Sequence, residues 1–331
     1  MLRRTALSTT LALPFVASSA RAQDLTSRPI TLVVGFSPGG STDITSRLLA
    51  DRLGPALGPG GRVVVENRAG ASGLIASDWL RRQPTDGSII MLNEASSHAL
   101  APHAVTGGTR YDPIADFTHI AMVGTAPLIL TGSPQFPART AQEAVAHMRG
   151  GSPETLPFAS SGVGSMPHLA GEMVAASLGL AGRFPHVPYR SGGAMVESTA
   201  RGETAWGVAI LASAAAQVRD NRVKGFAVTG NERFPSFPDI PTLAESGIPG
   251  FDLANWFAII GPRGMPEATV TALNRAIRAS LAEPQLRERL LVAGVAPWTR
   301  DNSPAATRAY FVSENEKFRA IVAQTGIRLD P

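Results

Sequence analysis

The sequence predicts an α/β protein with a largely parallel sheet, divided into two lobes. Short apolar runs rich in β-branched residues alternate with segments whose apolar residues recur at helical spacing. This alternation is typical of parallel strands connected by crossover helices. The chain has 331 residues, which suits two domains of about 150 residues each. Small turns that contain glycine join four of the expected strands to the helices that follow them.

The first third of the chain shows this pattern three times. The first strand is expected at Ile30–Phe36, a continuous apolar run like those of buried parallel strands. A helix begins near Thr42, with apolar residues on one face at Ile44, Leu48, Leu49, Leu53 and Leu57. The second strand is Arg62–Glu66, and a short helix through Leu74 and Trp79 follows it. The third strand is expected at Ser88–Leu92.

The middle of the chain repeats the same order of elements. Strands are expected at Phe158–Ser160, His186–Pro188, Trp206–Ile210 and Val223–Thr229. Helices follow the first two of these strands, one from Met166 to about Leu178 and one through Ala200. The proline-rich stretch 234–241 can continue neither a central strand nor a helix. We interpret it as a loop near a crossing between the two domains.

Two helices are expected in the last quarter of the chain. The first carries Val270, Leu273, Ile277 and Leu281 on one stripe. The second begins at Ser303-Pro304, a pair that suits an N-cap and the first helical position.

The first 22 residues are expected to be a secretory signal peptide rather than part of the fold. A basic start is followed by a short apolar run and by Ala20-Arg21-Ala22, which matches a cleavage site. A buried N-terminal helix is the alternative, and Arg3-Arg4 also permits twin-arginine export. No later apolar run is long enough for a membrane helix, and there is no cysteine to carry a lipid or a disulfide. We therefore expect a soluble, unlipidated periplasmic protein.

The basic net charge does not indicate nucleic-acid binding. The chain has 30 basic and 26 acidic residues, a net charge of +4. Three of the basic residues lie in the expected signal peptide, so 27 basic residues remain against 26 acidic ones. No basic run with interleaved aromatic residues occurs, and binding to nucleic acid is not expected.

The glycine-bearing turns are the main chemical signal. They span residues 37–42, 68–73, 160–165 and 189–194, and each follows a strand and opens a helix. A helix N-terminus offers unpaired N–H groups and partial positive charge, and glycine lets a ligand approach them closely. Ligands of open α/β sheets bind at the carboxyl ends of the strands. The turns therefore predict an anion site between two lobes, although each turn alone could be a simple connection. The turn at 160–165 contains G-x-G but lacks the third glycine of the dinucleotide-binding motif, and no turn has the Gly-Lys-Ser/Thr ending of the Walker motif.

No catalytic, metal or cofactor site is predicted. The six histidines lack the spacing of a helical metal pair, and the common metalloprotease and serine-hydrolase motifs are absent. Asp43 either compensates the helix dipole or contacts a ligand. Arg68 and Arg190 lie on glycine turns and either meet an anion or face solvent. Trp206 and Trp256 are either core residues or stacking platforms.

The segments around these turns resemble the extracytoplasmic solute-binding proteins of tripartite tricarboxylate transporters, also called the Bug family. The resemblance runs in order over nearly the whole mature chain. It is carried by ITLVVGFSPGGSTD at 30–43, VVVENRAGASG at 63–73, YDPIADF at 111–117, SSGVGSMPHLAGE at 160–172, HVPYRSGG at 186–193, FPSFPDIPTLAESGIPG at 234–250 and WFAIIGPRG at 256–264.

The resemblance implies a type II periplasmic binding fold, with two lobes that close on a small ligand. The first lobe would comprise residues 23–122 and 231–331, and the second residues 123–230. The implied ligand is a small organic carboxylate, and the implied partners are membrane transport subunits. Monomers are the simplest expectation. The implied ligand-binding positions are Pro38, Gly39, Gly40, Thr42, Asp43, Ala71, Ser72, Ser96, Ser97, Ser161, Gly162, Gly164, Ser165, His168, Tyr189, Gly192 and Gly193.

One departure from the family bears on the ligand. Members often carry acidic residues around the strand expected at Trp206–Ile210, and this sequence has none there. An ammonium group would lose an ionic partner, so we expect a carboxylate without an amine, or an aromatic acid that rests on Trp206. A ligand sensor of the same fold and an α/β enzyme that acts on a small anion remain as alternative functions.

Overall fold

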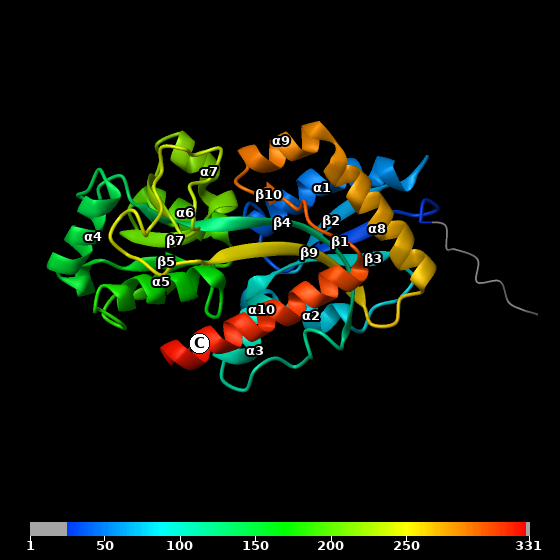
Figure 1. Cartoon of the computed structure of the whole chain (residues 1–331), viewed down its shortest axis with the longest axis horizontal. Helices are drawn as coiled ribbons and strands as arrows, with labels where there is room; N and C mark the ends of the chain where they lie inside the picture. The colour runs from blue at the N-terminus through cyan, green and yellow to red at the C-terminus, as the bar shows by residue number, and fades with distance from the viewer. Residues whose placement is uncertain (1–24, 329–331) are drawn as a thin grey trace, which may run out of the picture.

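The computed structural model describes residues 25–328, which form two α/β lobes side by side along the long axis (Figure 1). The predicted fold class is confirmed. The expected signal peptide at 1–22 lies outside the described residues. The strands follow one another in the order β2-β1-β3-β9-β4-β7-β5-β6, with β8 and β10 also paired to β4.

The first lobe is built on a sheet whose outer strands are parallel. Both β2 and β3 run parallel to β1, whereas β9 runs antiparallel to β3 and to β4. These strands are β1 (Ile30–Val34), β2 (Val63–Asn67), β3 (Ile89–Glu94), β9 (Ala254–Pro262) and the short β10 (Ala296–Pro297). The parallel arrangement predicted from the sequence therefore holds for β2, β1 and β3, while β9 lies between β3 and β4 and runs antiparallel to both.

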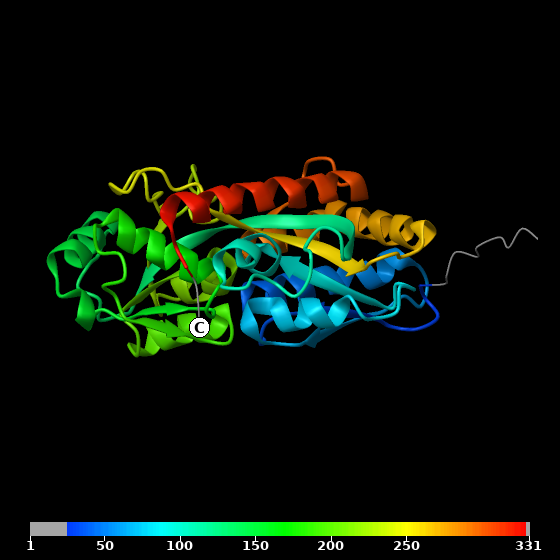
Figure 2. The same cartoon turned by 90° about the horizontal axis from the view of Figure 1, so that it is seen from below.

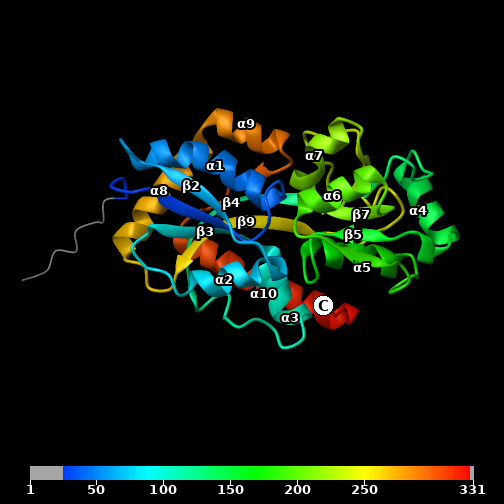
Figure 3. The same ribbon diagram turned by 180° about the vertical axis from the view of Figure 1, so that it is seen from behind.

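Helices cover both faces of this sheet, with α1 and α9 on one side and α2 and α10 on the other (Figures 1 and 3). The elements that include helical turns are α1 (Ser41–Leu57), η1 (Ala71–Gly73), α2 (Leu74–Leu80), η2 (Ser96–Leu100), α3 (Ala101–Ala104), α8 (Glu267–Ala282), α9 (Pro284–Val292) and α10 (Pro304–Thr325). The predicted cap of α10 is confirmed, because the Ser303 hydroxyl accepts a hydrogen bond from the Ala306 N–H. Viewed from below, α10 runs lengthwise with its end toward the second lobe (Figure 2).

The second lobe contains the middle of the chain. Its strands are β5 (Phe158–Ser160), β6 (His186–Pro188), β7 (Trp206–Ile210) and β8 (Lys224–Val228). Its helices are α4 (Ala141–Gly150), η3 (Pro153–Thr155), α5 (Met166–Ser177), α6 (Gly192–Arg201) and α7 (Leu211–Arg219). Strand β5 runs parallel to β6 and β7. The proline-rich stretch 234–241 forms neither helix nor strand, as predicted.

The long strand β4 (Phe117–Gly132) belongs to both lobes. Its first part pairs with β9 from Phe117 to Pro127, and its last part pairs with β7 from Leu128 to Gly132. Figure 1 shows β4 and β9 running together along the middle of the molecule. Pairing of β4 therefore holds the two lobes in one continuous sheet.

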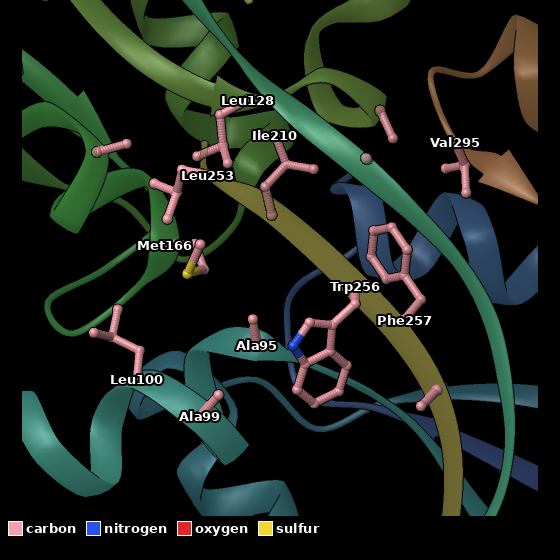
Figure 4. Close-up of a cluster of buried hydrophobic side chains, with 14 of the residues drawn as sticks. Ala95, Ala99, Leu100, Leu128, Met166, Ile210, Leu253, Trp256, Phe257 and Val295 are labelled. Atoms are coloured by element: carbon pink, nitrogen blue, oxygen red, sulfur yellow. The ribbon is translucent and has the colours of Figure 1, made fainter. Parts of the chain in front are cut away.

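The hydrophobic core continues from one lobe to the other beside these strands. Trp256 and Phe257 on β9 are fully buried. In Figure 4, the Trp256 side chain lies near Ala95 of the first lobe, and Met166 and Ile210 of the second lobe lie in the same cluster. Burial of apolar surface from both lobes stabilises this arrangement of the lobes by roughly 25 cal/mol for each Å² removed from water.

Candidate functional site

The four glycine turns converge where the two lobes face each other. A Cβ atom added to Gly193 would lie 2.5 Å from the carbonyl oxygen of Gly39, and one added to Gly40 would lie 3.2 Å from the Gly192 nitrogen. No real Cβ approaches another heavy atom as closely as 2.5 Å. Glycine at Gly193 therefore permits direct backbone contact between the turn that opens α6 and the turn that opens α1.

Hydrogen bonds cross the cleft beside these glycines. They include Ser41 N–H to Ser213 Oγ at 2.8 Å, Ser72 Oγ to the Val163 carbonyl at 2.6 Å, and Met166 N–H to Ser96 Oγ at 3.0 Å. The Ser41 and Met166 donors belong to the first turns of α1 and α5, where N–H groups have no partner within the helix. The two lobes thus satisfy part of each other's helix N-termini.

Two cavities adjoin at this junction and share Phe36 and Ser161 in their walls. The larger, here called the outer cavity, has a volume of about 590 Å³. It is lined by Phe36, Ser37, Ala69, Gly70, Ala71, Ser72, Leu74, Val105, Ser161, Gly162, Val163, Tyr189 and Arg190. A volume of several hundred Å³ is typical of small-molecule sites.

The smaller space, here called the inner cavity, has a volume of about 10 Å³, room for a single water molecule. Its walls are Phe36, Gly40, Ser41, Thr42, Glu94, Ser161, Pro167, Gly192, Ile210 and Ser213. It therefore collects the N-terminal ends of α1 and α6 and the start of α7.

About half of the residues implied by the family resemblance line these cavities. They are Gly40, Thr42, Ala71, Ser72, Ser161, Gly162, Tyr189 and Gly192. The others are not among the residues that line either cavity: Pro38, Gly39, Asp43, Ser96, Ser97, Gly164, Ser165, His168 and Gly193. The Tyr189 hydroxyl pairs with Ser198 within the second lobe.

Asp43 holds the first glycine turn in place. Its carboxylate accepts hydrogen bonds from the Gly39 N–H at 3.0 Å, from the Asn67 amide at 3.0 Å and from the Arg47 guanidinium at 2.9 Å. Burial raises the pKa of this carboxyl, but the bonds from Arg47, Gly39 and Asn67 outweigh burial and leave the pKa below its ordinary value. The carboxylate of Asp43 thus stabilises the turn.

The turn that opens α5 is held in a similar way. The Ser165 hydroxyl caps the helix by accepting a hydrogen bond from the His168 N–H. His168 Nδ1 in turn accepts a hydrogen bond from the Gly164 N–H at 3.4 Å. Ser165 and His168 thus fix the peptide groups of the turn through hydrogen bonds from its backbone N–H groups.

The residues that follow β3 are also engaged with their neighbours. The Ser97 hydroxyl accepts a hydrogen bond from the Asn93 amide at 3.1 Å, and the Ser97 carbonyl accepts one from the Tyr111 hydroxyl. The Ser96 hydroxyl accepts the bond from Met166 N–H that crosses the cleft. Both serines therefore connect the end of β3 to other elements.

The two arginines of the glycine turns differ in their surroundings. The Arg68 guanidinium forms an ion pair with Glu66 at 2.6 Å and stacks 3.8 Å from the centroid of the Trp79 ring. Its charge is therefore engaged by these two residues, away from the cavities. Arg190 is exposed and lines the outer cavity. Arg190 is therefore the turn arginine that is placed to meet an anion in the cleft.

Trp206 is part of the core of the second lobe. It is fully buried, stacks on Phe158 with ring centroids 5.1 Å apart, and donates its indole N–H to the Leu156 carbonyl. The prediction of an aromatic acid resting on Trp206 is therefore wrong, because neighbouring rings cover its faces. Trp256 is likewise a core residue.

The sequence reasoning missed two polar residues of the inner cavity. Ser213 lies in the first turn of α7 and binds the Ser41 N–H. Glu94 is the last residue of β3, and burial raises the pKa of its carboxyl to about 7, although hydrogen bonds from Ser96 and Asn255 act in the opposite direction. The available signal for Glu94 is an acid two residues after the apolar run that ends at Leu92, but the predicted strand ends at Leu92 and leaves Glu94 outside it.

Between residues 25 and 328, no helix is long and apolar enough to cross a membrane. No group of three or more histidine or carboxylate side chains in this range is placed to hold a metal ion.

Comparison with known proteins agrees with this geometry. Residues 45–327 match the family described as "Tripartite tricarboxylate transporter family receptor". The protein BugT of Bordetella pertussis is 30% identical over 314 residues, which cover 95% of this chain and 94% of BugT. Among solved structures, R. palustris Rpa4515 with adipate has a TM-score of 0.85 at 29% identity and covers 92% of this chain and 99% of its own.

A second solved structure of the same kind is MatC from Rhodopseudomonas palustris with bound malate. It has a TM-score of 0.82 at 27% identity and covers 89% of this chain and 99% of its own. The family match spans most of the chain, and the relatives are matched over nearly their whole length. The chain therefore belongs to the receptors of the tripartite tricarboxylate transporter family, the solute-binding proteins also called the Bug family.

Proposed function

We propose that this receptor captures a small organic carboxylate between its lobes and delivers it to membrane transport subunits. The observation that carries the proposal is the convergence of glycine turns from both lobes on adjoining cavities. Helix N-termini at Ser41 and Gly192 favour a negative group there, and Arg190 adds a positive charge to the outer cavity. The relatives solved with adipate and with malate support the same ligand class.

Closure of the lobes is the step that couples capture to delivery. A ligand stabilises the closed state only through contacts that it makes better there than in the open state. Peptide groups from both lobes reach the same cavities, so one carboxylate bridging them gains contacts that neither lobe offers alone. The transport subunits would then bind the loaded, closed form. We further propose that the protein works as a periplasmic, unlipidated monomer.

The test is to identify what the protein carries. Native mass spectrometry of freshly purified protein should show a bound small acid. Thermal-shift measurements with malate, adipate, benzoate, aspartate and glutamate should show stabilisation by at least one acid that lacks an amine. Deleting the gene should abolish uptake of that acid by cells.

Two results would contradict the proposal. A large shift with aspartate or glutamate and none with the other acids would exclude a carboxylate without an amine. Conversion of the tightest ligand during incubation with the purified protein would indicate an enzyme rather than a binding protein.

A further inference from the structure

Glu94 is a buried acid in the wall of the inner cavity. It ends β3, and its neighbour across the sheet is Phe257 on β9. Only 2% of its surface is exposed, and its Oε1 atom has no hydrogen-bond partner among the described residues. A buried oxygen without a hydrogen-bond partner destabilises the folded state relative to a satisfied one. Such an atom in a cavity wall indicates a contact that a ligand completes.

The rest of the inner cavity favours a negative group. Glu94 is the one titratable residue among the ten that line it. Ser41 and Gly192 are the first residues of α1 and α6, so two helix N-termini meet at the same space. One oxygen of a ligand carboxylate drawn to these ends would take the place of the single water molecule for which the inner cavity has room, beside Glu94, while the rest of the ligand lies in the adjoining outer cavity. Two adjacent carboxylates repel one another unless one of them holds a proton.

The elements packed against β3 leave the Glu94 carboxyl without a charged partner. Strands β1 and β9 carry no titratable residue. Those on α1, α2 and η2 are Asp43, Arg47, Asp51, Arg52, Asp78 and His98. Asp43 pairs with Arg47, Asp51 with Arg289, Arg52 with Glu283, and Asp78 with Arg81 and Arg82. Burial lowers the pKa of His98, so it carries no charge at neutral pH.

We propose that Glu94 binds the ligand as a neutral carboxylic acid, and that its hydroxyl donates a hydrogen bond to a carboxylate oxygen of the ligand. Ionised Glu94 takes one proton from solvent on binding, and the proton returns to solvent on release. Capture at alkaline pH is therefore coupled to uptake of one proton. This inference rests on the proposed function, because it assumes a carboxylate ligand in the cleft.

The electrostatic surroundings support the neutral form. Burial raises the pKa of Glu94 to about 7 before any ligand charge is added, and the hydrogen bonds from Ser96 and Asn255 do not reverse this effect. A carboxylate placed beside it raises the pKa further. A ligand ammonium would instead favour ionised Glu94 and give no proton uptake. Proton uptake on binding thus distinguishes an acid without an amine from an amino acid at this site.

Calorimetry of the full-length mature protein tests the coupling. Malate and adipate are titrated at pH 8 in phosphate and in Tris, whose different heats of ionisation reveal the number of protons exchanged. We expect about one proton taken up by the wild type and about none by Glu94→Gln. The glutamine amide still donates a hydrogen bond, so this variant should bind at least as tightly as the wild type at pH 8.

The pH dependence should separate the same two proteins. Wild-type affinity should fall about tenfold for each pH unit between the pKa of Glu94 in the ligand-free protein, about 7, and its higher pKa in the loaded protein, the expected slope for one linked proton. The affinity of Glu94→Gln should stay flat. Glu314→Gln is the matched control, because Glu314 is also a buried acid with a raised pKa but lines neither cavity. It should keep the wild-type proton uptake.

The failure of this inference differs from failure of the proposed function. Binding of malate or adipate without proton uptake, or uptake that persists in Glu94→Gln, overturns the inference and leaves carboxylate capture intact. If no carboxylate in the panel binds, the proposed function fails. In that case, the thermal stability of the ligand-free protein tests whether Glu94 is neutral in the folded state.

That second measurement follows thermal stability against pH. Unfolded glutamate ionises near pH 4.5, whereas folded Glu94 holds its proton to about pH 7. The folded state binds more protons in this window, so the wild type loses stability as pH rises through it. Glu94→Gln lacks this loss and should gain in melting temperature relative to the wild type between pH 5 and 8. A difference that does not change with pH overturns the neutral form of Glu94.

Discussion

His168 and His186 stack beneath the glycine turn that opens α5. Their ring centroids are 3.8 Å apart and their planes differ by 9°. His186 Nε2 pairs with the Ser160 hydroxyl at 2.6 Å. His168 Nδ1 accepts the Gly164 N–H, which requires that this nitrogen carry no proton. Two charged rings at this separation would repel, so the turn depends on neutral histidines.

This pair predicts a loss of stability in acid. Burial lowers the pKa of His168 to about 3, with a smaller effect from His186, and lowers the pKa of His186 to about 4. In the unfolded chain both rings take up protons near pH 6.5. The unfolded state therefore binds more protons below pH 6.5, and the free energy of unfolding should fall as pH drops from 6.5 toward 4. Urea denaturation at several pH values measures this slope.

A variant assigns the slope to the pair. His186→Gln removes one ring of the stack and should reduce the acid slope by about one proton. His147→Gln is the control, because His147 lies on α4 and its ring packs against Phe136 rather than against a histidine. Equal acid slopes in the wild type and His186→Gln would refute this account.

At the scale of an element, the first turn of α6 sets how closely the lobes approach. Gly193 lies inside that helix, so alanine there should not weaken the helix itself. Its Cβ would nevertheless lie 2.5 Å from the Gly39 carbonyl oxygen in the other lobe. We expect Gly193→Ala to keep the wild-type melting temperature without ligand and to bind the captured acid at least about tenfold more weakly, which corresponds to ~1.4 kcal/mol. Calorimetry and thermal melts measure the two quantities.

Gly150→Ala provides the control for this substitution. Gly150 is the last residue of α4, and a Cβ added there meets nothing within 4 Å. Unchanged affinity in Gly193→Ala would show that the two turns do not touch in the loaded protein.

Elements with a clear local pattern were predictable from the sequence, and those defined by long-range pairing were not. The strand β7 and the start of α10 match their predicted positions because apolar runs and helix caps are local signals. Strand β4 carries His119 and Pro127 within an apolar stretch, and only its pairing with β9 and β7 makes it one strand of 16 residues. Periodicity contains no information on that pairing.

The candidate site shows the same division. The glycine turns were predictable from their composition. Predicting Glu94 as a site residue required the true end of β3, and predicting Ser213 required the contact between α7 and α1. Both depend on contacts between residues far apart in sequence. The mistaken role of Trp206 has the same origin, since burial by Phe158 and Phe184 is invisible in the sequence.

At the scale of the whole molecule, the hydrogen bond from Ser41 N–H to Ser213 Oγ joins the two lobes, so we expect it to break when the lobes open. Ser213→Ala leaves this N–H buried and unpaired in the closed state, at a cost of about 1–3 kcal/mol. The open state does not bear this cost, because water reaches the N–H there. We expect a fall in ligand affinity of about 5- to 150-fold with little change in the melting temperature of the ligand-free protein. Calorimetry with the captured acid measures the change.

Ser177→Ala is the control, because Ser177 is an exposed residue of α5 whose hydroxyl bonds within its own helix. A wild-type affinity in Ser213→Ala would mean that the Ser41 N–H finds another partner in the loaded protein. Small-angle scattering with and without ligand should show that the wild type becomes more compact on binding.

The pairing of β9 with β3 also determines which lobe can complete its sheet first during synthesis. Residues 91–94 are the last residues of β3. They pair with residues 257–260 of β9, which are synthesised much later. The strands β5, β6 and β7 pair with one another over a much shorter stretch of chain. A ribosome therefore finishes the second lobe's parallel strands long before it supplies β9, the second neighbour of β3. The half of the protein made first is the half that must wait longest for its native sheet.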